Sequence, residues 1–457
     1  MRLRSRSTGG TMRSLRRPTG GLWGHPDFLR MWVGQSISEL GSQISQLAIP
    51  LLAVIGLHAS PFDFALLGVL GFLPFIIFAL PAGVWVDRLR RRQILIVGDS
   101  SRAVLLALIP ILWAAGVLRM WHLLVLQFVI GIFTVFFDVA YQSYLPALVD
   151  REHLVEGNSK LQLTVSVAQV AGPSASGALV GAITAPYAVV FDAVSFVIST
   201  AFMLRMRHRE SVPVRTQDGS QPKMWPQVKE GLRWVVGHRW LRAIAMCTGT
   251  SNFFGSVGFA VLVVYAVRAL HFSPFEVGAM FAVGSGGSIV GALLANRIQQ
   301  RIGVGPTIVA MSVAFCCSGL AYPLAPHSLA LPVFMIGQLL GGFGGVAYNI
   351  TQVSLRQAIT PERLQGRMNA AMRWIVWGTI PLGALLGGSL GQWVGLRTAL
   401  WAGAIGSLIA FLPVALSSVR SITAMPTPVA EPTPGQAELE GGLIEPTPLP
   451  GPAAADA

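Results

Sequence analysis

Charged residues are scarce in this sequence. Only 12% of the 457 residues are Asp, Glu, Lys or Arg, whereas a soluble domain carries about 25%. Together with a mean hydropathy of +0.61, this scarcity excludes a soluble enzyme or a disordered chain as the main architecture. Apolar runs of the length that crosses a bilayer, about 20 residues, recur between residues 28 and 418. The sequence therefore predicts an integral membrane protein.

Metal-binding and nucleotide-binding patterns are also lacking. The three cysteines, Cys247, Cys316 and Cys317, lie in apolar spans without metal-type spacing, so we expect them to be packing residues. The eight His form neither HExxH nor a Cys/His cluster, and the chain has no GxxxxGK[ST]. We expect no metal, no cofactor and no ATP. A membrane enzyme would be expected to cluster His, Asp or Glu at a membrane surface, and no such cluster is present, so we expect the protein not to be an enzyme.

Basic residues exceed acidic ones, 33 to 20, which in a soluble protein would suggest a nucleic-acid partner. Their placement argues against one, because they gather up to Arg30, in 88–92 and in 205–242. The intervening connections hold only three basic residues. This is the positive-inside pattern, so we expect both termini and the long middle loop to be cytoplasmic, in a bacterial inner (plasma) membrane. The N-terminal arm lacks the apolar core of a signal peptide, so the first span should stay uncleaved.

The apolar spans fall into two sets of six. They are 28–56, 63–86, 94–116, 121–145, 161–183 and 186–206, then 239–267, 275–296, 306–324, 329–355, 367–391 and 396–418. The expected divisions are a basic cytoplasmic arm (1–27), an N-terminal six-helix bundle (28–206), a cytoplasmic central loop (207–238), a C-terminal six-helix bundle (239–418) and a disordered Pro-rich acidic cytoplasmic tail (419–457). In the central loop, Trp225, Val228, Leu232 and Val235 have the spacing of an interfacial amphipathic helix.

The two sets repeat each other in the same direction. SPFD at 60–63 returns as SPFE at 273–276, and Ala-Tyr at 140–141 returns at 347–348. Two further pairs of matching segments are separated along the chain by nearly the same number of residues. Parallel repeats of this kind place a substrate site between the halves near mid-membrane.

The segment GVWVDRLRRR, from Gly83 to Arg92, resembles the GxxxDRxxRR loop motif of the major facilitator superfamily. The resemblance implies that Asp87 and Arg91 latch the two halves on the cytoplasmic side, with Asp138 on the fourth span as acidic partner. A glycine at position 83 would allow close helix approach. The alternative is an arginine cluster that only sets topology, and Arg90 departs from the family's usual glycine. The gate residues implied are Gly83, Asp87, Arg88, Arg91, Arg92 and Asp138.

The fifth span contains AQVAGPSASG at 168–177, similar to a degenerate antiporter motif GxxxGPxxGG. Gly172, Pro173 and Gly177 match, whereas Ala168 and Ser176 replace glycines. Proline removes a backbone donor and kinks a helix, and small residues permit close packing. Ordinary helix packing is the alternative explanation. In the family, this motif accompanies exporters.

Three further segments, at 192–196, 230–233 and 361–369, resemble the enterobactin exporter and macrolide efflux branch. The resemblance covers residues 28–418. It implies the major facilitator fold, an all-α integral membrane protein of twelve transmembrane helices in two parallel six-helix repeats. It also implies a monomeric antiporter that exports small amphipathic molecules, such as drugs, siderophores or secondary metabolites, in exchange for protons. Its partners would be substrate, protons and membrane lipids, and not nucleic acid.

Ionisable residues inside spans are costly and are candidate functional groups. Glu39 lies about eleven residues into the first span, roughly 16 Å at 1.5 Å per residue, and is the first candidate for carrying a proton. A structural hydrogen bond is its alternative role. Asp192 lies nearer the outer end, where a structural role is favoured. Arg373 could attract an anionic substrate or pair between helices. Asp99 and Arg102 are expected to pair on one helix face.

Several polar positions could line the transport cavity: Gln35, Gln43, Gln46, Asn252, Tyr265, Asn349 and Gln352. Two other functions stay open, a lipid or metabolite importer and a non-transporting membrane sensor. Uptake of a labelled compound would favour the first, and substrate binding without flux would favour the second.

Overall fold

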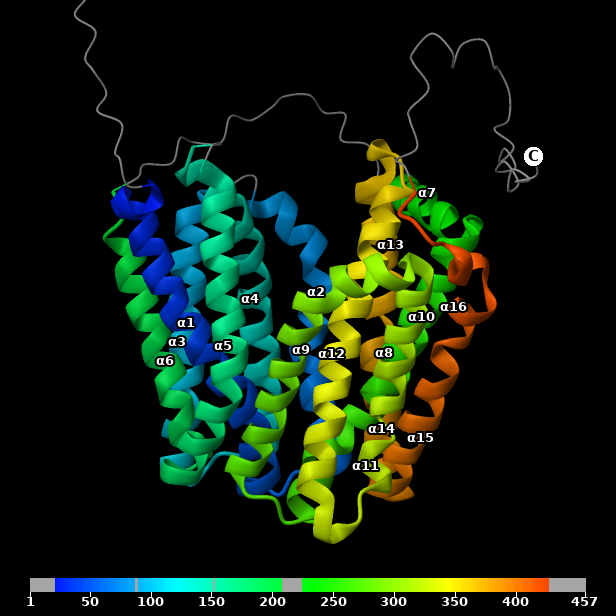
Figure 1. Cartoon of the computed structure of the whole chain (residues 1–457). Coiled ribbons are helices and arrows are strands. Elements are labelled where there is room, and N and C mark those ends of the chain that lie inside the picture. Colours follow the sequence, from blue (N-terminus) through cyan, green and yellow to red (C-terminus); the bar gives the residue numbers. More distant parts are fainter. Residues whose placement is uncertain (1–20, 87–88, 151–152, 208–223, 427–457) are drawn as a thin grey trace, which may run out of the picture.

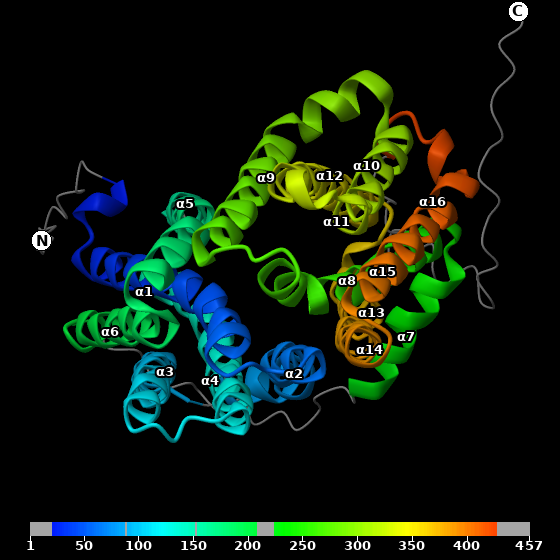
Figure 2. The same ribbon diagram turned by 90° about the horizontal axis from the view of Figure 1, so that it is seen from below.

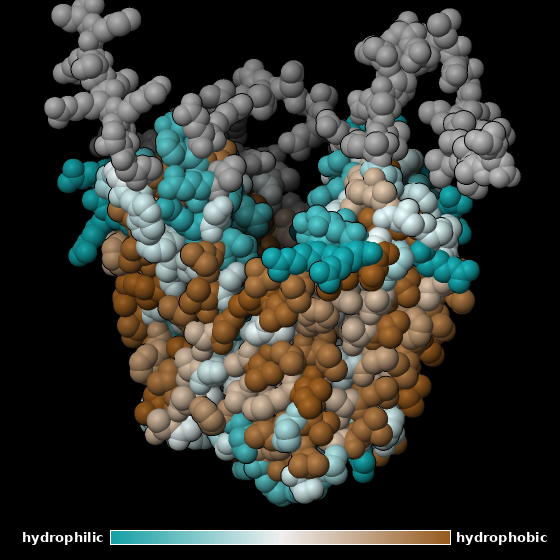
Figure 3. Space-filling view, in the orientation of Figure 1, coloured by the Kyte–Doolittle hydropathy of each residue, from teal (hydrophilic) through white to brown (hydrophobic). Residues whose placement is uncertain are grey.

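The computed structural model describes residues 21–86, 89–150, 153–207 and 224–426. Every regular element in these ranges is a helix, and twelve segments are long and apolar enough to span a membrane. The predicted all-α architecture with twelve spans is therefore confirmed. Figure 3 shows a broad apolar region on the face in view, as a lipid-facing surface requires. Leu293 and Trp393 are among the exposed apolar side chains.

The N-terminal half contains six spans in the order of the chain. After the 3-10 turn η1 (Gly21–Gly24), they are α1 (Pro26–Leu51) with the π-helical end η2 (Leu52–Gly56), α2 (Pro61–Val86), α3 (Arg91–Ala114), α4 (Met120–Leu148), α5 (Leu154–Ile183) and α6 (Ala185–Leu204).

The C-terminal half also contains six spans, three of them built from two consecutive helices. The helix α7 (Met224–Gly237) precedes α8 (Arg239–Arg268), α9 (Pro274–Ile302), α10 with α11 (Val304–Ser318 and Ala321–Leu324), the 3-10 turn η4 (His327–Leu329) with α12 (Ala330–Ala358), α13 with α14 (Glu362–Trp377 and Thr379–Trp393), and α15 with α16 (Leu396–Ala410 and Leu412–Leu416). The short turn η5 (Ser418–Ser421) follows.

Small residues set the distances between helices inside each half. A Cβ added at Gly291 of α9 would lie 2.4 Å from the carbonyl oxygen of Phe343 in α12, and one at Gly131 of α4 would lie 2.7 Å from the Pro74 ring of α2. Helices in a bilayer gain little from burying apolar surface against each other, so van der Waals contact at small residues drives their association. Both pairs stand side by side in Figure 2.

The two halves meet at the end of the molecule opposite the termini, through α5 with α9 and α2 with α14 (Figures 1 and 2). There, Gly388 packs so closely that an added Cβ would lie 2.4 Å from Cβ of Ala65. The Arg268 side chain, at the end of α8, donates to the carbonyl oxygen of Ala59 at 2.7 Å and so joins the halves. On the side of the termini the halves diverge, and Figure 3 shows a hollow between them.

The repeated SPFD and SPFE sequences begin the two helices that reach across to the opposite half. Ser60 Oγ accepts from the backbone N–H of Asp63 at 3.1 Å, and Ser273 Oγ accepts from that of Glu276 at 3.3 Å. These are capping interactions that satisfy free N–H groups at a helix start. The repeat predicted from the sequence therefore fixes the starts of α2 and α9.

The helix expected in the central loop is present as α7, in which Val235 is buried and Leu232 is 43% exposed. It packs on α13, where a Cβ on Gly231 would lie 2.3 Å from the Arg367 carbonyl oxygen. One boundary of the C-terminal half differs from the expectation. The tail predicted from residue 419 begins in packed structure, because Val419 is buried and the carbonyl of Ile422 accepts from Gly305 N at 2.7 Å. Residues 427–457 lie outside the described part.

The contact between α5 and α9 can be tested by filling it. A Cβ at Gly278 would lie 2.4 Å from the Pro173 carbonyl oxygen, so Gly278→Leu should overpack this contact and cost about 1–3 kcal/mol. Gly286→Leu on the same helix is the control, because a Cβ there meets no atom within 4 Å. We expect the thermal unfolding temperature of the purified protein to fall for Gly278→Leu only. An equal fall in both variants would contradict the contact.

Candidate functional site

A buried ion pair lies in the middle of the N-terminal half. Asp99 and Arg102 of α3 form it, and both side chains are almost wholly buried. The second carboxylate oxygen of Asp99 accepts from Ser199 Oγ of α6 at 2.6 Å. The predicted pairing on one helix face is thus present, and it also ties α3 to α6.

Two aromatic rings enclose the Arg102 guanidinium group. Its central carbon lies 4.2 Å from the ring centroid of Phe137 in α4 and 4.2 Å from that of Phe196 in α6. Ring faces carry partial negative charge and attract cations, more strongly where water is excluded. Arg102 therefore holds α3, α4 and α6 together with its charge compensated.

Asp192 of α6 faces α1. It can accept from Ser195 Oγ at 3.3 Å and from Ser42 Oγ at 3.4 Å, and it is 2% exposed. Gly41 leaves the space for this approach, since a Cβ there would lie 2.8 Å from the carboxylate. Hydroxyl donors suit either an ionised or a protonated carboxyl group, so the setting fits the structural role favoured for Asp192.

Glu39 of α1 is half-buried, and its carboxylate accepts from Gln43 Nε2 at 3.2 Å. Its charge acts on Asp138 and on Tyr141 of α4, and Asp138 also interacts with Arg102. The Tyr141 hydroxyl is buried without a hydrogen-bond partner among the described residues. Glu39, Asp138 and Tyr141 thus lie within electrostatic range of one another, and we call these three residues the acid cluster.

Tyr141 was not predicted as a functional residue, although the sequence contained a signal. It belongs to the repeated Ala-Tyr pair, and its counterpart Tyr348 on α12 hydrogen-bonds Thr248 of α8 at 2.7 Å. In the C-terminal half the tyrosine is paired with the neutral Thr248, whereas in the N-terminal half Tyr141 lies in the field of the acidic Glu39. This difference marks the N-terminal half as the one that carries charge.

The predicted cytoplasmic gate is only partly described. Asp87 and Arg88 lie outside the described residues. Arg92 donates to the carbonyl oxygens of Met203 at 3.1 Å and Leu204 at 2.9 Å, at the end of α6, where a cation stabilises a helix C-terminus. Arg91 is half-buried.

The other two predicted gate residues lie differently from expectation. The close helix approach expected at Gly83 is absent in this conformation, because a Cβ there would meet nothing within 4 Å and the halves diverge on this side. Asp138, expected as the acidic partner of the gate, lies in the acid cluster with Glu39 and Arg102 as electrostatic partners.

The antiporter-like motif contacts helices on two sides of α5. Toward α1, a Cβ on Gly172 would lie 2.3 Å from that of Gln43, and Ser176 Oγ donates to the Ile44 carbonyl at 2.8 Å. Toward α9, a Cβ on Gly177 would lie 2.6 Å from the Pro274 carbonyl oxygen. The close packing predicted for the small residues is therefore present, and the motif forms part of the contact between the halves.

Arg373 of α13 is exposed and lies over the ring of Trp377, 5.1 Å from its centroid. Trp377 in turn packs against Phe72 of α2, with ring centroids 5.9 Å apart. Arg373 is therefore near a place where the two halves touch. Its described contact is with an aromatic ring rather than with a carboxylate.

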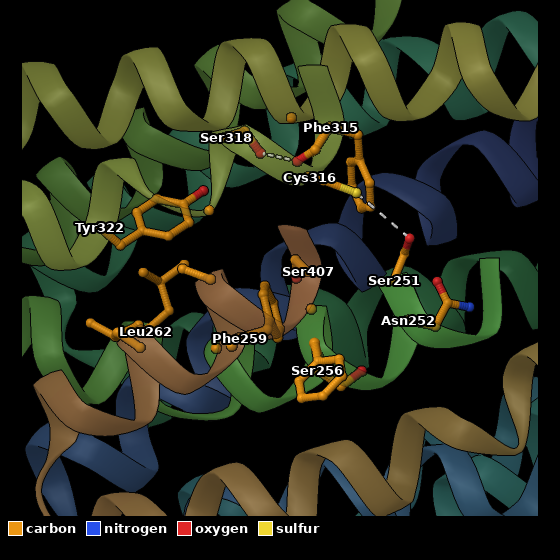
Figure 4. A pocket seen from close by; sticks show the side chains of 18 of the residues that line it. Ser251, Asn252, Ser256, Phe259, Leu262, Phe315, Cys316, Ser318, Tyr322 and Ser407 are labelled. Carbon is orange, nitrogen blue, oxygen red and sulfur yellow. Dashed lines mark hydrogen bonds between the residues drawn. The ribbon is translucent and has the colours of Figure 1, made fainter. Parts of the chain in front are cut away.

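The C-terminal half contains a cavity of about 430 Å³ (Figure 4). Its lining comes from α8, α10, α11, α12, α14 and α15, and none of the lining residues carries a charge. Of the polar positions expected to line a cavity, only Asn252 does so here; Tyr265 and Gln352 are buried instead. Cys316, expected only to pack, also lines the cavity. The sequence signal was the run of small and polar residues in the seventh span, SNFFGSVG at 251–258.

Two of the segments that carried the resemblance to efflux proteins meet in space. Glu230 of α7 pairs with Arg367 of α13 and lies 3.6 Å from Arg363. These ion pairs hold the linking helix against the C-terminal half. In the described part of the chain, no group of three or more His, Cys, Asp or Glu side chains could hold a metal ion.

The model of one protein family, described as transmembrane secretion effector, matches residues 23–439. The chain belongs to this family. Macrolide efflux protein A of Streptococcus pyogenes is 24% identical over 86% of this chain and 96% of its own. The multidrug efflux pump Tap of Mycobacterium tuberculosis is 26% identical over 79% and 86%. The protein is therefore a major facilitator transporter of the efflux branch.

Solved structures show the same fold. A bacterial homologue of the iron transporter ferroportin in an inward-facing state has a TM-score of 0.66 at 17% identity, covering 85% of this chain and 98% of its own. The nucleoside transporter NupG also has a TM-score of 0.66, at 10% identity, with 85% and 98% covered. At these identities the likeness concerns the arrangement of the helices, and the predicted two-half, twelve-helix fold is confirmed.

The buried ion pair gives a prediction about stability. Asp99→Ala leaves the Arg102 charge without its partner, and breaking a buried pair on one side costs about 3–5 kcal/mol. Asp99→Leu combined with Arg102→Met removes both charges and should cost less than either single change. Unfolding of the purified protein by SDS titration would measure the free energies. Additive losses in the double variant would contradict the pairing.

Proposed function

We propose that this transporter exports small amphipathic organic molecules in exchange for protons, by alternating access. Two observations support export by this route. The halves touch at the end opposite the termini and diverge on the terminal side, as expected of a conformation that is open to one side. Relatives named as efflux proteins cover most of the chain.

The acid cluster is the proposed site of proton coupling, and Glu39 is the group that carries the proton. A coupling group must be neutral when buried and charged when hydrated, and Glu39 is half-buried at mid-depth beside Asp138 and Tyr141. Glu39 also accepts a hydrogen bond from Gln43 and lies within electrostatic range of Asp138. This half-buried position of an acidic side chain inside the first span is the observation that carries the proposal.

The gate proposed from the sequence motif would act in the opposite conformation. Asp87 and Arg91 follow the end of α2, on the side where the halves diverge, so their latch would form when that side closes. Arg92, next to Arg91, hydrogen-bonds the C-terminal end of α6. In that closed state, Asp138 would have to serve the gate as well as the acid cluster.

The proposed orientation follows from charge. The side of the termini carries the basic connections, so we assign both termini to the cytoplasm of a bacterial cell and the α5–α9 contact to the outer face. The structure is then open to the cytoplasm. We propose that the protein acts as a monomer, with each chain holding a complete pair of halves.

Loss of proton coupling in Glu39→Gln tests the proposal. A screen for compounds that leave cells faster when the protein is present supplies a transported compound. In proteoliposomes, Glu39→Gln should still bind this compound but should lose accumulation driven by a pH gradient, because an amide cannot exchange a proton. Glu156→Gln, which removes a carboxylate near the start of α5, is the matched control and should transport as wild type does.

Two outcomes would contradict the proposal. If Glu39→Gln accumulates the compound under a pH gradient as wild type does, then Glu39 is not the coupling group and Asp192 is the next candidate. If wild-type cells take up the compound instead of extruding it, the protein is an importer.

A further inference from the structure

Several buried or half-buried charged side chains lie in one half of the protein, and a cavity with an uncharged lining lies in the other. Glu39, Asp99, Arg102, Asp138 and Asp192 all belong to the N-terminal half. The cavity of about 430 Å³ lies entirely within the C-terminal half. Its volume is within the range of about 300–1,000 Å³ that is typical of small-molecule sites.

One lining side chain has an unused hydrogen-bonding group. Ser407 of α15 is 7% exposed, and it makes no hydrogen bond to another described residue. By contrast, the hydroxyl groups of Ser251 and Ser318 are occupied by the carbonyls of Cys247 and Phe315. Figure 4 shows Ser407 among the side chains that surround the cavity. The Ser407 hydroxyl is therefore free to hydrogen-bond a ligand in the cavity.

Further polar groups line the same cavity. The Asn252 side chain donates to the Val376 carbonyl at 3.1 Å, which leaves its amide oxygen as an acceptor. Ser256 and Gln338 line the cavity without a hydrogen bond to another described residue. The cavity therefore offers several uncommitted donors and acceptors.

Aromatic rings supply the rest of the contact area. Phe259 and Tyr322 lie on different helices, α8 and α11, and both line the cavity (Figure 4). Flat rings favour stacking or edge contacts with an aromatic ligand. Because the lining has no carboxylate, a cation would lose its hydration without a counter-charge. The cavity chemistry thus favours an uncharged ligand with an aromatic ring and hydroxyl or amide groups.

We infer that this cavity is the substrate-binding subsite of the transporter and that the substrate is an uncharged aromatic compound bearing hydrogen-bonding groups. The inference rests on the proposed export function and specifies its substrate class. Proton and substrate then bind in separate halves. They affect each other only through the change in the arrangement of the halves, which is how distinct sites become coupled.

Gly255 provides a direct test. It lines the cavity, and a Cβ there would meet no atom within 4 Å, so Gly255→Leu fills the cavity without disturbing helix contacts. Gly68→Leu on α2 is the matched control, because its added Cβ also meets no atom within 4 Å and it lies outside the cavity lining. Ser407→Ala is the second variant, which removes the free hydroxyl without breaking an internal hydrogen bond.

The probes are chloramphenicol and 4-nitrobenzyl alcohol, which are uncharged nitroaromatic compounds, and ethidium, a permanent aromatic cation. Equilibrium dialysis with purified full-length protein measures binding without any gradient, so failure of proton coupling cannot affect the result. We expect at least one uncharged probe to bind, with an affinity lowered at least about tenfold by Gly255→Leu. Ser407→Ala should lower it about two- to tenfold, and Gly68→Leu should leave it unchanged. Ethidium should not compete.

Three results would overturn the inference: no binding of either uncharged probe to wild type, unchanged binding in Gly255→Leu with a normal unfolding temperature, or displacement of the bound probe by ethidium. Failure of this inference is distinguishable from failure of the proposed export function. Binding with the expected variant pattern but no proton-driven flux would leave the cavity assignment intact and refute the antiporter.

Discussion

Close contact between the halves, where α5 ends and α9 begins, is the constraint on which the arrangement depends. Gly177 and Gly278 face each other there, and neither position has room for a side chain. In a bilayer, association of helices depends on such close packing rather than on burial of apolar surface. Because these closest contacts lie at one end, the halves can diverge at the other. The hydrogen bond from Arg268 to Ala59 adds a polar link at the same end.

The two halves share a fold and differ in chemistry. Tyr141 and Tyr348 occupy matching places, yet one lies in the field of Glu39 and the other hydrogen-bonds Thr248. An ion pair with two flanking rings stiffens the N-terminal half, which can then keep ionisable groups at mid-depth. The C-terminal half has no comparable charge around its cavity, and its lining suits a neutral molecule. In this account, the two halves share a fold because they are repeats, and their different side chains give them different roles in transport.

Much of the fold was predictable because bilayer thickness fixes helix length and the basic connections alternate along the chain. The repeat also predicted correctly that SPFD and SPFE mark equivalent helix starts. Contacts between the transmembrane helices were harder to predict. Nearly every span is apolar, so its periodicity does not show which face packs against which neighbouring helix. The C-terminal cavity could not be predicted, since it arises where six helices leave space between small residues. The gate role of Asp138, which the family motif implies, stays a prediction, because Asp87 lies outside the described residues.

The central claim is that one end of the molecule closes as the other opens, under control of Glu39. Distances between spin labels would test it, with one pair at Leu89 and Ile302 near the termini and another at Val117 and Leu329 at the opposite end, all exposed sites. Pulsed electron paramagnetic resonance across a pH series should show the first distance shortening as the second lengthens. Glu39→Gln should remove this pH response. Distances that change together, or a wild-type response in Glu39→Gln, would contradict the account.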